Sequence, residues 1–334
     1  MASESSRPVA SSDIYPNCLI QVKERRRVKL APGRKHLPPY AILSHRWILE
    51  KEINNEDFFM YSLLQRPSLK LPDLQPAWYQ REISKVRTKL NSGGLKISGA
   101  CKQARRDGIK YLWVDTCCIE QGNHADVKKN ITSMYAYYQN AQVCYVYLAD
   151  VEDKSGMFWE FGKQLGSEWF QRGWTLQELL APRNVVFFNK YWERIGDKHE
   201  LLDGIYHTTT IPRNVISGEC SIRDIDVMTR MSWSIKRTTT RPQDLAYCLQ
   251  GLLGVTVEPD YEEHHFTSFN RLGKTLLDAH PAFFDANPEL KDGLFQKVND
   301  SYFWKQANSR FSVTRVKILD EVLQLRDVKD SKED

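Results

Sequence analysis

The sequence lacks the features that mark several large classes of protein. No run approaches the ~18 consecutive apolar residues that a membrane-spanning helix needs, and residues 1–12 are polar and serine-rich, without the apolar stretch of a secretory leader. The seven cysteines include no CxxC pair and follow no regular spacing, which excludes a disulfide framework and indicates reduced thiols. The net charge is only +5, and one tight basic cluster, Lys23–Lys29, stands alone. We therefore expect a soluble cytoplasmic protein with no membrane span and no nucleic-acid partner.

Complete motifs for a metal or nucleotide site are missing as well. Gly273–Thr275 matches only the end of a phosphate-binding loop, because position 268 is Ser268 and the triplet lies inside a helical pattern. The pair His264–His265 has no HExxH frame, and the adjacent Cys117–Cys118 cannot both ligate one metal comfortably. The sequence therefore predicts no metal site and no bound cofactor. If the strand ends converge, one of these cysteines near His45 is a candidate nucleophile; the alternative is a pair of buried structural thiols.

What the chain does contain is an alternation of apolar strands and amphipathic helices. Its 334 residues are 41% hydrophobic and 11% aromatic, enough to bury a sizeable core. The alternation predicts an α/β fold, a flavodoxin-like doubly wound and mostly parallel sheet with the 40–44 strand at its centre. After about residue 200 the apolar spacing is helical only, which predicts a C-terminal helical extension. We expect strands at 40–44, 111–114, 143–149 and 185–188, an irregular excursion over 49–91, and three regions: a disordered tail (1–15), the α/β domain (16–200) and the extension (201–334).

Polar residues at the ends of the predicted strands form the first candidate site. Ser44, His45 and Arg46 end or follow the first strand, and Asp115 follows the second. In open parallel sheets, ligands bind beyond the carboxyl ends of the strands, where the strand order reverses. An arginine beside carboxylates suits a ligand with phosphate and ribose, because guanidinium binds phosphate and a carboxylate accepts from sugar hydroxyls. Two structural alternatives stay open: Asp115 caps the following turn, and Arg46 neutralises Asp115 in a partly buried pair.

The second candidate is one carboxylate in an apolar helix. Trp174 and Glu178 are four residues apart and share a helix face. We therefore expect the indole to wall one side of the carboxylate, while leucines of the same helix bury the other side. A desolvated carboxylate of this kind is a candidate functional group. The alternative is a surface helix in which Glu178 pairs with Arg172 or Arg183.

Three ordered segments resemble the signature blocks of the fungal heterokaryon incompatibility (HET) domain: Tyr40–Trp47 (YAILSHRW), Trp113–Gln121 (WVDTCCIEQ) and Arg172–Pro182 (RGWTLQELLAP). The similarity covers about residues 37–195 and departs at Glu120, where the family usually has aspartate. The resemblance implies a cell-death effector that acts in nonself recognition during hyphal fusion. It also implies self-association on activation, with an allelic or NLR-like sensor protein as a partner.

The HET domain in turn resembles the Toll/interleukin receptor (TIR) domain. Ser44–Trp47 resembles the TIR block at the end of the first strand, and Trp174–Leu179 resembles the WCLxEL block of TIR helix C, whose glutamate is catalytic in TIR enzymes that consume NAD. This implies that Glu178 is the catalytic residue and that NAD is a substrate rather than a cofactor. The alternative that stays open is a non-enzymatic homotypic adaptor of the same fold. The residues that the resemblance and the strand ends assign to substrate binding are Ser44, His45, Arg46, Trp47, Asp115, Glu120 and Trp174, with Arg46 on the pyrophosphate and Trp47 or Tyr135 stacked on a ring.

Overall fold

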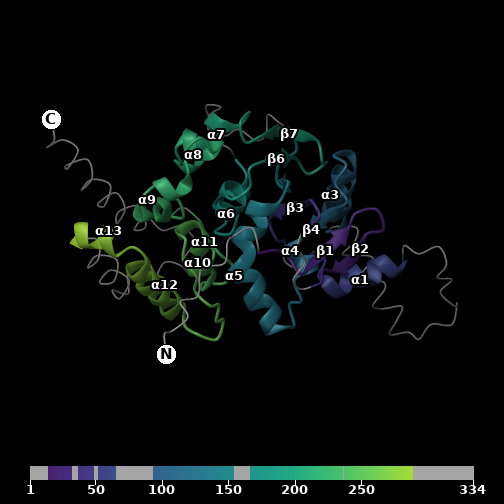
Figure 1. The fold of residues 1–334 in the computed structure, drawn as a ribbon. Helices are drawn as coiled ribbons and strands as arrows, with labels where there is room; N and C mark the ends of the chain where they lie inside the picture. The colour runs from purple at the N-terminus through teal and green to yellow at the C-terminus, as the bar shows by residue number, and fades with distance from the viewer. Residues whose placement is uncertain are drawn as a thin grey trace.

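The computed structural model describes residues 14–31, 37–48, 52–64, 93–153, 166–235 and 237–288. This part of the chain forms a seven-stranded sheet flanked by helices, with the strand order β2-β1-β4-β3-β5-β6-β7 (Figure 1). The strands are β1 (Cys18–Gln21), β2 (Arg26–Lys29), β3 (Tyr40–His45), β4 (Tyr111–Trp113), β5 (Val143–Tyr147), β6 (Val185–Phe188) and β7 (Arg194–Asp197). Since β3 has three strands on either side, the predicted central position of this strand is confirmed.

Parallel pairing is confined to the inner strands. β3 runs parallel to both β4 and β5, and β5 runs parallel to β6. Every residue of β3 is buried, as expected for a parallel strand that is covered on both faces and therefore reads as a continuous apolar run. The predicted doubly wound α/β fold is confirmed. The strand order reverses at β3, so the switch point of the sheet lies at the carboxyl end of this strand.

The outer pairings are antiparallel, and sequence reasoning did not predict three of the strands that make them, β1, β2 and β7. β1 pairs with β2 and β4, and β7 pairs with β6. The sequences of β2 (RRVK) and β7 (RIGD) are short and charged, so they lack the apolar run that identifies an inner strand. Charges on an edge strand oppose pairing with the edge of another chain. The two edges of the sheet are therefore built from residues that composition alone assigns to loops.

Helices connect the parallel strands and continue beyond the sheet. Those that precede or connect the inner strands are α1 (Asn55–Leu64), α3 (Gly94–Arg106), α4 (Asp115–Cys118), α5 (His124–Asn140), the 3-10 turn η4 (Glu168–Gln171) and α6 (Thr175–Leu180). Those after β7 are α7 (Leu202–Thr209), α8 (Arg213–Ser217), the 3-10 turn η5 (Ile222–Asp224), α9 (Val227–Ser232), α10 (Asp244–Tyr247), α11 (Gln250–Leu253), α12 (His265–Ala279) and α13 (Pro281–Ala286). In the described ranges, none of these helices combines the length and the apolar character needed to cross a membrane.

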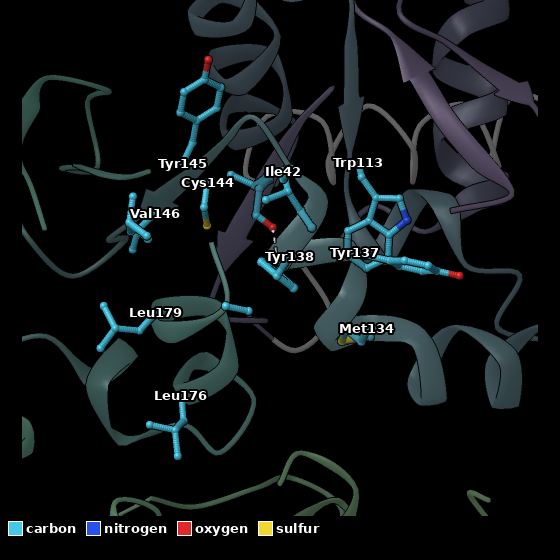
Figure 2. Packing of buried hydrophobic residues seen from close by; sticks show 14 of the residues in the cluster. Ile42, Trp113, Met134, Tyr137, Tyr138, Cys144, Tyr145, Val146, Leu176 and Leu179 are labelled. Carbon is cyan, nitrogen blue, oxygen red and sulfur yellow. Dashed lines mark hydrogen bonds between the residues drawn. The ribbon is translucent and has the colours of Figure 1, made fainter. Parts of the chain in front are cut away.

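Side chains of α5 and α6 pack on one face of the inner strands. The ring of Trp113 meets Tyr137 and Tyr138 of α5 edge-on, with ring centroids 5.6 and 6.1 Å apart. Figure 2 shows Tyr145 of β5 directed away from the leucines of α6. On that opposite side its hydroxyl donates to Asp107, which directly follows α3. Helices thus cover both faces of the sheet, and the carboxyl end of β3 lies between them.

Candidate functional site

Glu178 lies at the carboxyl end of the central strand. Its helix α6 buries Leu176 and Leu179 in the core, which holds the short helix against the sheet. Glu178 itself is only 5% exposed, and its carboxylate accepts a hydrogen bond from the hydroxyl of Ser44 near the end of β3. The alternative in which Glu178 forms a surface pair with Arg172 or Arg183 is therefore wrong. The structure brings Ser44 and Glu178 into direct contact.

Two aromatic side chains complete the polar surroundings of Glu178. The indole Nε1 of Trp169 donates to Ser44 Oγ at 2.8 Å, and the Tyr138 hydroxyl donates to the carbonyl oxygen of Leu43, next to Ser44, at 3.3 Å. The Ser44 hydroxyl thus accepts one hydrogen bond and donates another. Sequence reasoning did not predict these two contacts. Tyr138 belongs to the apolar stripe of α5 and reads as core, and Trp169 lies in a short 3-10 turn without periodicity.

The pKa of Glu178 is shifted toward the physiological range. Burial raises it from 4.5 to about 8, and the negative charge of Asp115 adds to the increase. The hydrogen bond from Ser44, the charge of Arg172 and the nearby Tyr138 hydroxyl oppose the increase without cancelling it. A carboxyl group with this pKa exchanges its proton close to neutral pH, and it is therefore a candidate acid or base.

Arg46 and Trp47, which follow β3, make separate contacts. The guanidinium of Arg46 pairs with Glu168 of η4. The indole of Trp47 donates to Asp115 Oδ2 at 2.7 Å, and 38% of Trp47 is exposed. The alternative in which Arg46 neutralises Asp115 is therefore wrong. Asp115 does accept a hydrogen bond from the Thr116 N–H at 2.7 Å, which agrees with the turn-capping alternative.

A buried ionic group surrounds His45. Its Nε2 lies 3.5 Å from Glu52 Oε2 and 3.8 Å from Asp115 Oδ1, and Lys96 of α3 pairs with Glu52. Although burial opposes it, the hydrogen bonds and charges of His45 and Lys96 lower the pKa of Glu52 to about 2. Sequence reasoning missed both Glu52 and Lys96. Glu52 lies in the stretch that was expected to be irregular, whereas a lysine on the apolar face of α3 is a signal of a buried partner.

Glu120 and the adjacent cysteines make contacts of their own. Glu120 Oε1 lies 3.6 Å from Arg27 Nη2 and 3.1 Å from Lys29 Nζ, so β2 neutralises this carboxylate. Burial raises the pKa of the Cys117 and Cys118 thiols well above the ordinary value. A thiol of this kind is a poor nucleophile. The structure therefore favours structural thiols over a nucleophile near His45.

Two aromatic residues that were expected at the site contact the C-terminal helices. Trp174 lies near the Asp244 carboxyl group at the start of α10, where it opposes the increase in pKa that burial causes. The ring of Tyr135 lies against Gly251 of α11, where an added Cβ would be 2.2 Å from the Tyr135 Cβ. Within the residues that the structure describes, no group of three or more His, Cys, Asp or Glu side chains is arranged to hold a metal ion.

Comparisons with known proteins identify relatives of this chain. Residues 40–164 match the family model described as heterokaryon incompatibility protein (HET). Vegetative incompatibility protein HET-E-1 from Podospora anserina is 36% identical over 306 residues, which cover 86% of this chain and 20% of that protein. The chain thus spans about a fifth of the length of this relative. No solved structure matches the chain.

Proposed function

Because this chain is a HET-domain protein, we propose that it acts in fungal heterokaryon incompatibility as a cell-death effector of nonself recognition. The family match and the similarity to a vegetative incompatibility protein support this role. In this proposal the protein acts in the cytoplasm and self-associates on activation. An allelic or NLR-like sensor protein supplies the trigger.

The finer proposal is that the chain cleaves NAD at the nicotinamide–ribose bond, with Glu178 as the catalytic residue. The observation that supports it is a buried carboxyl group that Ser44 holds at the carboxyl end of the central strand. This end of an open parallel sheet is where ligands bind. In addition, burial raises the pKa of Glu178 to about 8, and groups with strongly shifted pKa values gather at functional sites.

The chemistry of the cleavage suits an ionised Glu178. The nicotinamide–ribose bond breaks through an oxocarbenium-like state, in which nicotinamide takes the bonding electron pair and positive charge develops on the ribose. Glu178 stabilises this charge before water attacks the ribose and releases a proton, and loss of such a group typically costs about 10²-fold or more in rate. When NAD binds, Arg46 leaves Glu168 and binds the pyrophosphate instead. A guanidinium can bind phosphate oxygens as well as carboxylate oxygens through two hydrogen bonds.

A second candidate function is that of a non-enzymatic homotypic adaptor. The observation that favours it is the burial of Glu178, whose hydrogen bond with Ser44 fastens α6 to the sheet. In an adaptor this bond serves the fold alone. The charge of Glu178 is then dispensable, and cell death depends on a surface through which copies of the chain associate.

The deciding experiment follows NAD by chromatography after incubation with the purified chain, beside Glu178→Gln. Glutamine keeps the size of the side chain and removes its charge. The matched control is Glu152→Gln, the same change at an exposed carboxylate that pairs with Lys190. We expect wild type and Glu152→Gln to release nicotinamide and Glu178→Gln to release at least about 10²-fold less. Wild-type protein that leaves NAD intact, while its expression still kills fungal cells, would contradict catalysis and favour the adaptor.

A further inference from the structure

Arg237 is a charged residue enclosed in the core. It lies after α9, beyond the sheet, and is only 2% exposed. Its Nη1 donates to the carbonyl oxygen of Arg172 and to Thr175 Oγ1, both at 2.9 Å. Taking a guanidinium out of water is costly unless its hydrogen bonds are made inside the protein. Both hydrogen bonds go to residues at or just before the start of α6. The buried cation therefore holds the beginning of this helix in place.

The backbone next to Arg237 is bonded to the same turn. The Thr238 N–H donates to the carbonyl oxygen of Gln171 at 2.6 Å, and the Gly173 N–H donates to the carbonyl oxygen of Thr238 at 2.9 Å. A Cβ added at Gly173 would lie 2.6 Å from Thr239 Cγ2. The two segments thus approach each other so closely that only glycine fits at this position. The turn before α6 is therefore held by the side chain of Arg237 and by two backbone hydrogen bonds with Thr238.

Two sets of hydrogen bonds, joined through the residue Trp169, connect Arg237 with Glu178. The Thr175 hydroxyl, which accepts from Arg237, lies 2.6 Å from the carbonyl oxygen of Trp169. The Trp169 indole donates to Ser44, and Ser44 donates to Glu178. Arg237 therefore reaches Glu178 along two routes, through the turn that begins α6 and through the partner of Ser44. Loss of Arg237 would loosen both routes at once.

The charge of Arg237 also affects Glu178. Burial lowers the pKa of Arg237 to about 10, whereas the nearby Cys248 and Glu178 oppose this decrease, so Arg237 is a cation at neutral pH. A cation near Glu178 favours the ionised form of the carboxyl group. Among the described residues, the titratable or charged groups that interact electrostatically with Glu178 include Asp115 of α4, Tyr138 of α5, Cys144 of β5, Arg172 before α6, and Arg237.

We propose that Arg237 is a positioning residue for Glu178, through which a segment beyond the sheet sets the geometry and the ionisation of the candidate catalytic carboxyl group. This inference rests on the proposed role of Glu178, because without that role the arrangement would serve stability alone. It assigns a part of the site to the region after residue 201; the family match covers residues 40–164 and ends before Glu178. The region that follows the sheet thereby completes the site.

The test follows the ionisation of Glu178 by NMR in the full chain. The ¹⁵N–¹H indole resonance of Trp169, assigned with Trp169→Phe, reports on Glu178 through Ser44, and Glu178→Gln should abolish its titration. Wild type should titrate near pH 8. Arg237→Met, which removes the cation and its donors, should shift the midpoint to higher pH. The matched control is Arg230→Met, which removes another buried arginine, whose Nη1 donates to the Leu252 carbonyl oxygen.

Each outcome of this test decides the inference. An unchanged midpoint in folded Arg237→Met, or an equal shift in Arg230→Met, would overturn it. If Arg237→Met does not fold, Thr175→Val decides, because valine keeps the shape of threonine and breaks the hydroxyl link between Arg237 and Trp169. An upward shift in Thr175→Val supports the inference, and an unchanged midpoint overturns it. The readout needs no NAD, so an inactive wild type would contradict the proposed cleavage and leave the result for Arg237 standing.

Discussion

Replacement of Glu178 by glutamine tests the raised pKa of this carboxyl group through folding stability. A glutamate in the unfolded chain titrates near pH 4.5, whereas burial raises the pKa of Glu178 in the folded protein to about 8. Between these values the folded state holds a proton that the unfolded state has released. Stability therefore falls as pH rises, by about 1.4 kcal/mol per pH unit and by about 5 kcal/mol across the whole interval. Glutamine has no titratable proton at this position. The unfolding free energy of Glu178→Gln therefore does not decrease with pH for this reason.

Urea unfolding of wild type and Glu178→Gln at a series of pH values measures this effect. The difference in unfolding free energy should grow in favour of the variant as pH rises from 4.5, and it should level off above about pH 8. Glu152→Gln, at an exposed ion pair with Lys190, should show no such growth. A difference between Glu178→Gln and wild type that does not depend on pH would refute the argument from burial.

Three further predictions follow from the same contacts. If Glu178 must be ionised to act, NAD cleavage by wild type should rise with pH and level off above about pH 8, and a kcat that falls over this range would contradict the mechanism. Val146→Ala, at a position with no exposed surface, should lower the unfolding free energy by about 1–3 kcal/mol through lost burial and a cavity; urea unfolding without loss would mean that the strand is misplaced. Lys96→Met removes the lysine cation from the buried Glu52 carboxylate and should lower the unfolding free energy by about 3 kcal/mol. Because Glu52 then takes a proton more readily, this loss should shrink as pH falls below 4.5, and a loss that is constant with pH would exclude Glu52 as its source.

The inner strands could be predicted from the sequence because a strand that is buried on both faces is a continuous run of apolar residues. The run from Tyr40 to Ser44 is apolar up to its last residue, and the structure buries every position of β3. The edge strands β2 and β7 contain no such apolar run. In β2 the residues Arg26 and Arg27 are charged, and hairpin pairing with β1, rather than a pattern of its own, makes the segment a strand. Pairing with a neighbour is a tertiary property that a short polar segment does not encode locally.

Single residues of the candidate site could be predicted from the sequence, but the contacts between residues of different helices and strands could not. Strand-end geometry selects Ser44, and helical spacing together with family resemblance selects Glu178. The spacing also predicts that Trp174 walls Glu178, and this stays a prediction; the proximity of Trp174 to Asp244, a residue of α10, was not predicted. The i, i+4 rule describes neighbours on one helix and gives no signal for a residue of another helix, such as Asp244. The contacts of Ser44 with Trp169 likewise cross from strand to turn and have no local signal.

The burial that makes Glu178 a candidate catalyst also lowers the stability of the fold. As pH approaches 8, a neutral glutamine at this position avoids the linkage cost of the carboxyl group and keeps its size. Stability alone therefore favours glutamine, and a destabilising charge is expected where the charge itself is used. Stability and function can be measured on one variant. A Glu178→Gln protein that is more stable at alkaline pH and no longer cleaves NAD or kills supports catalysis. One that is more stable and kills as well as wild type limits Glu178 to the fold and favours the adaptor.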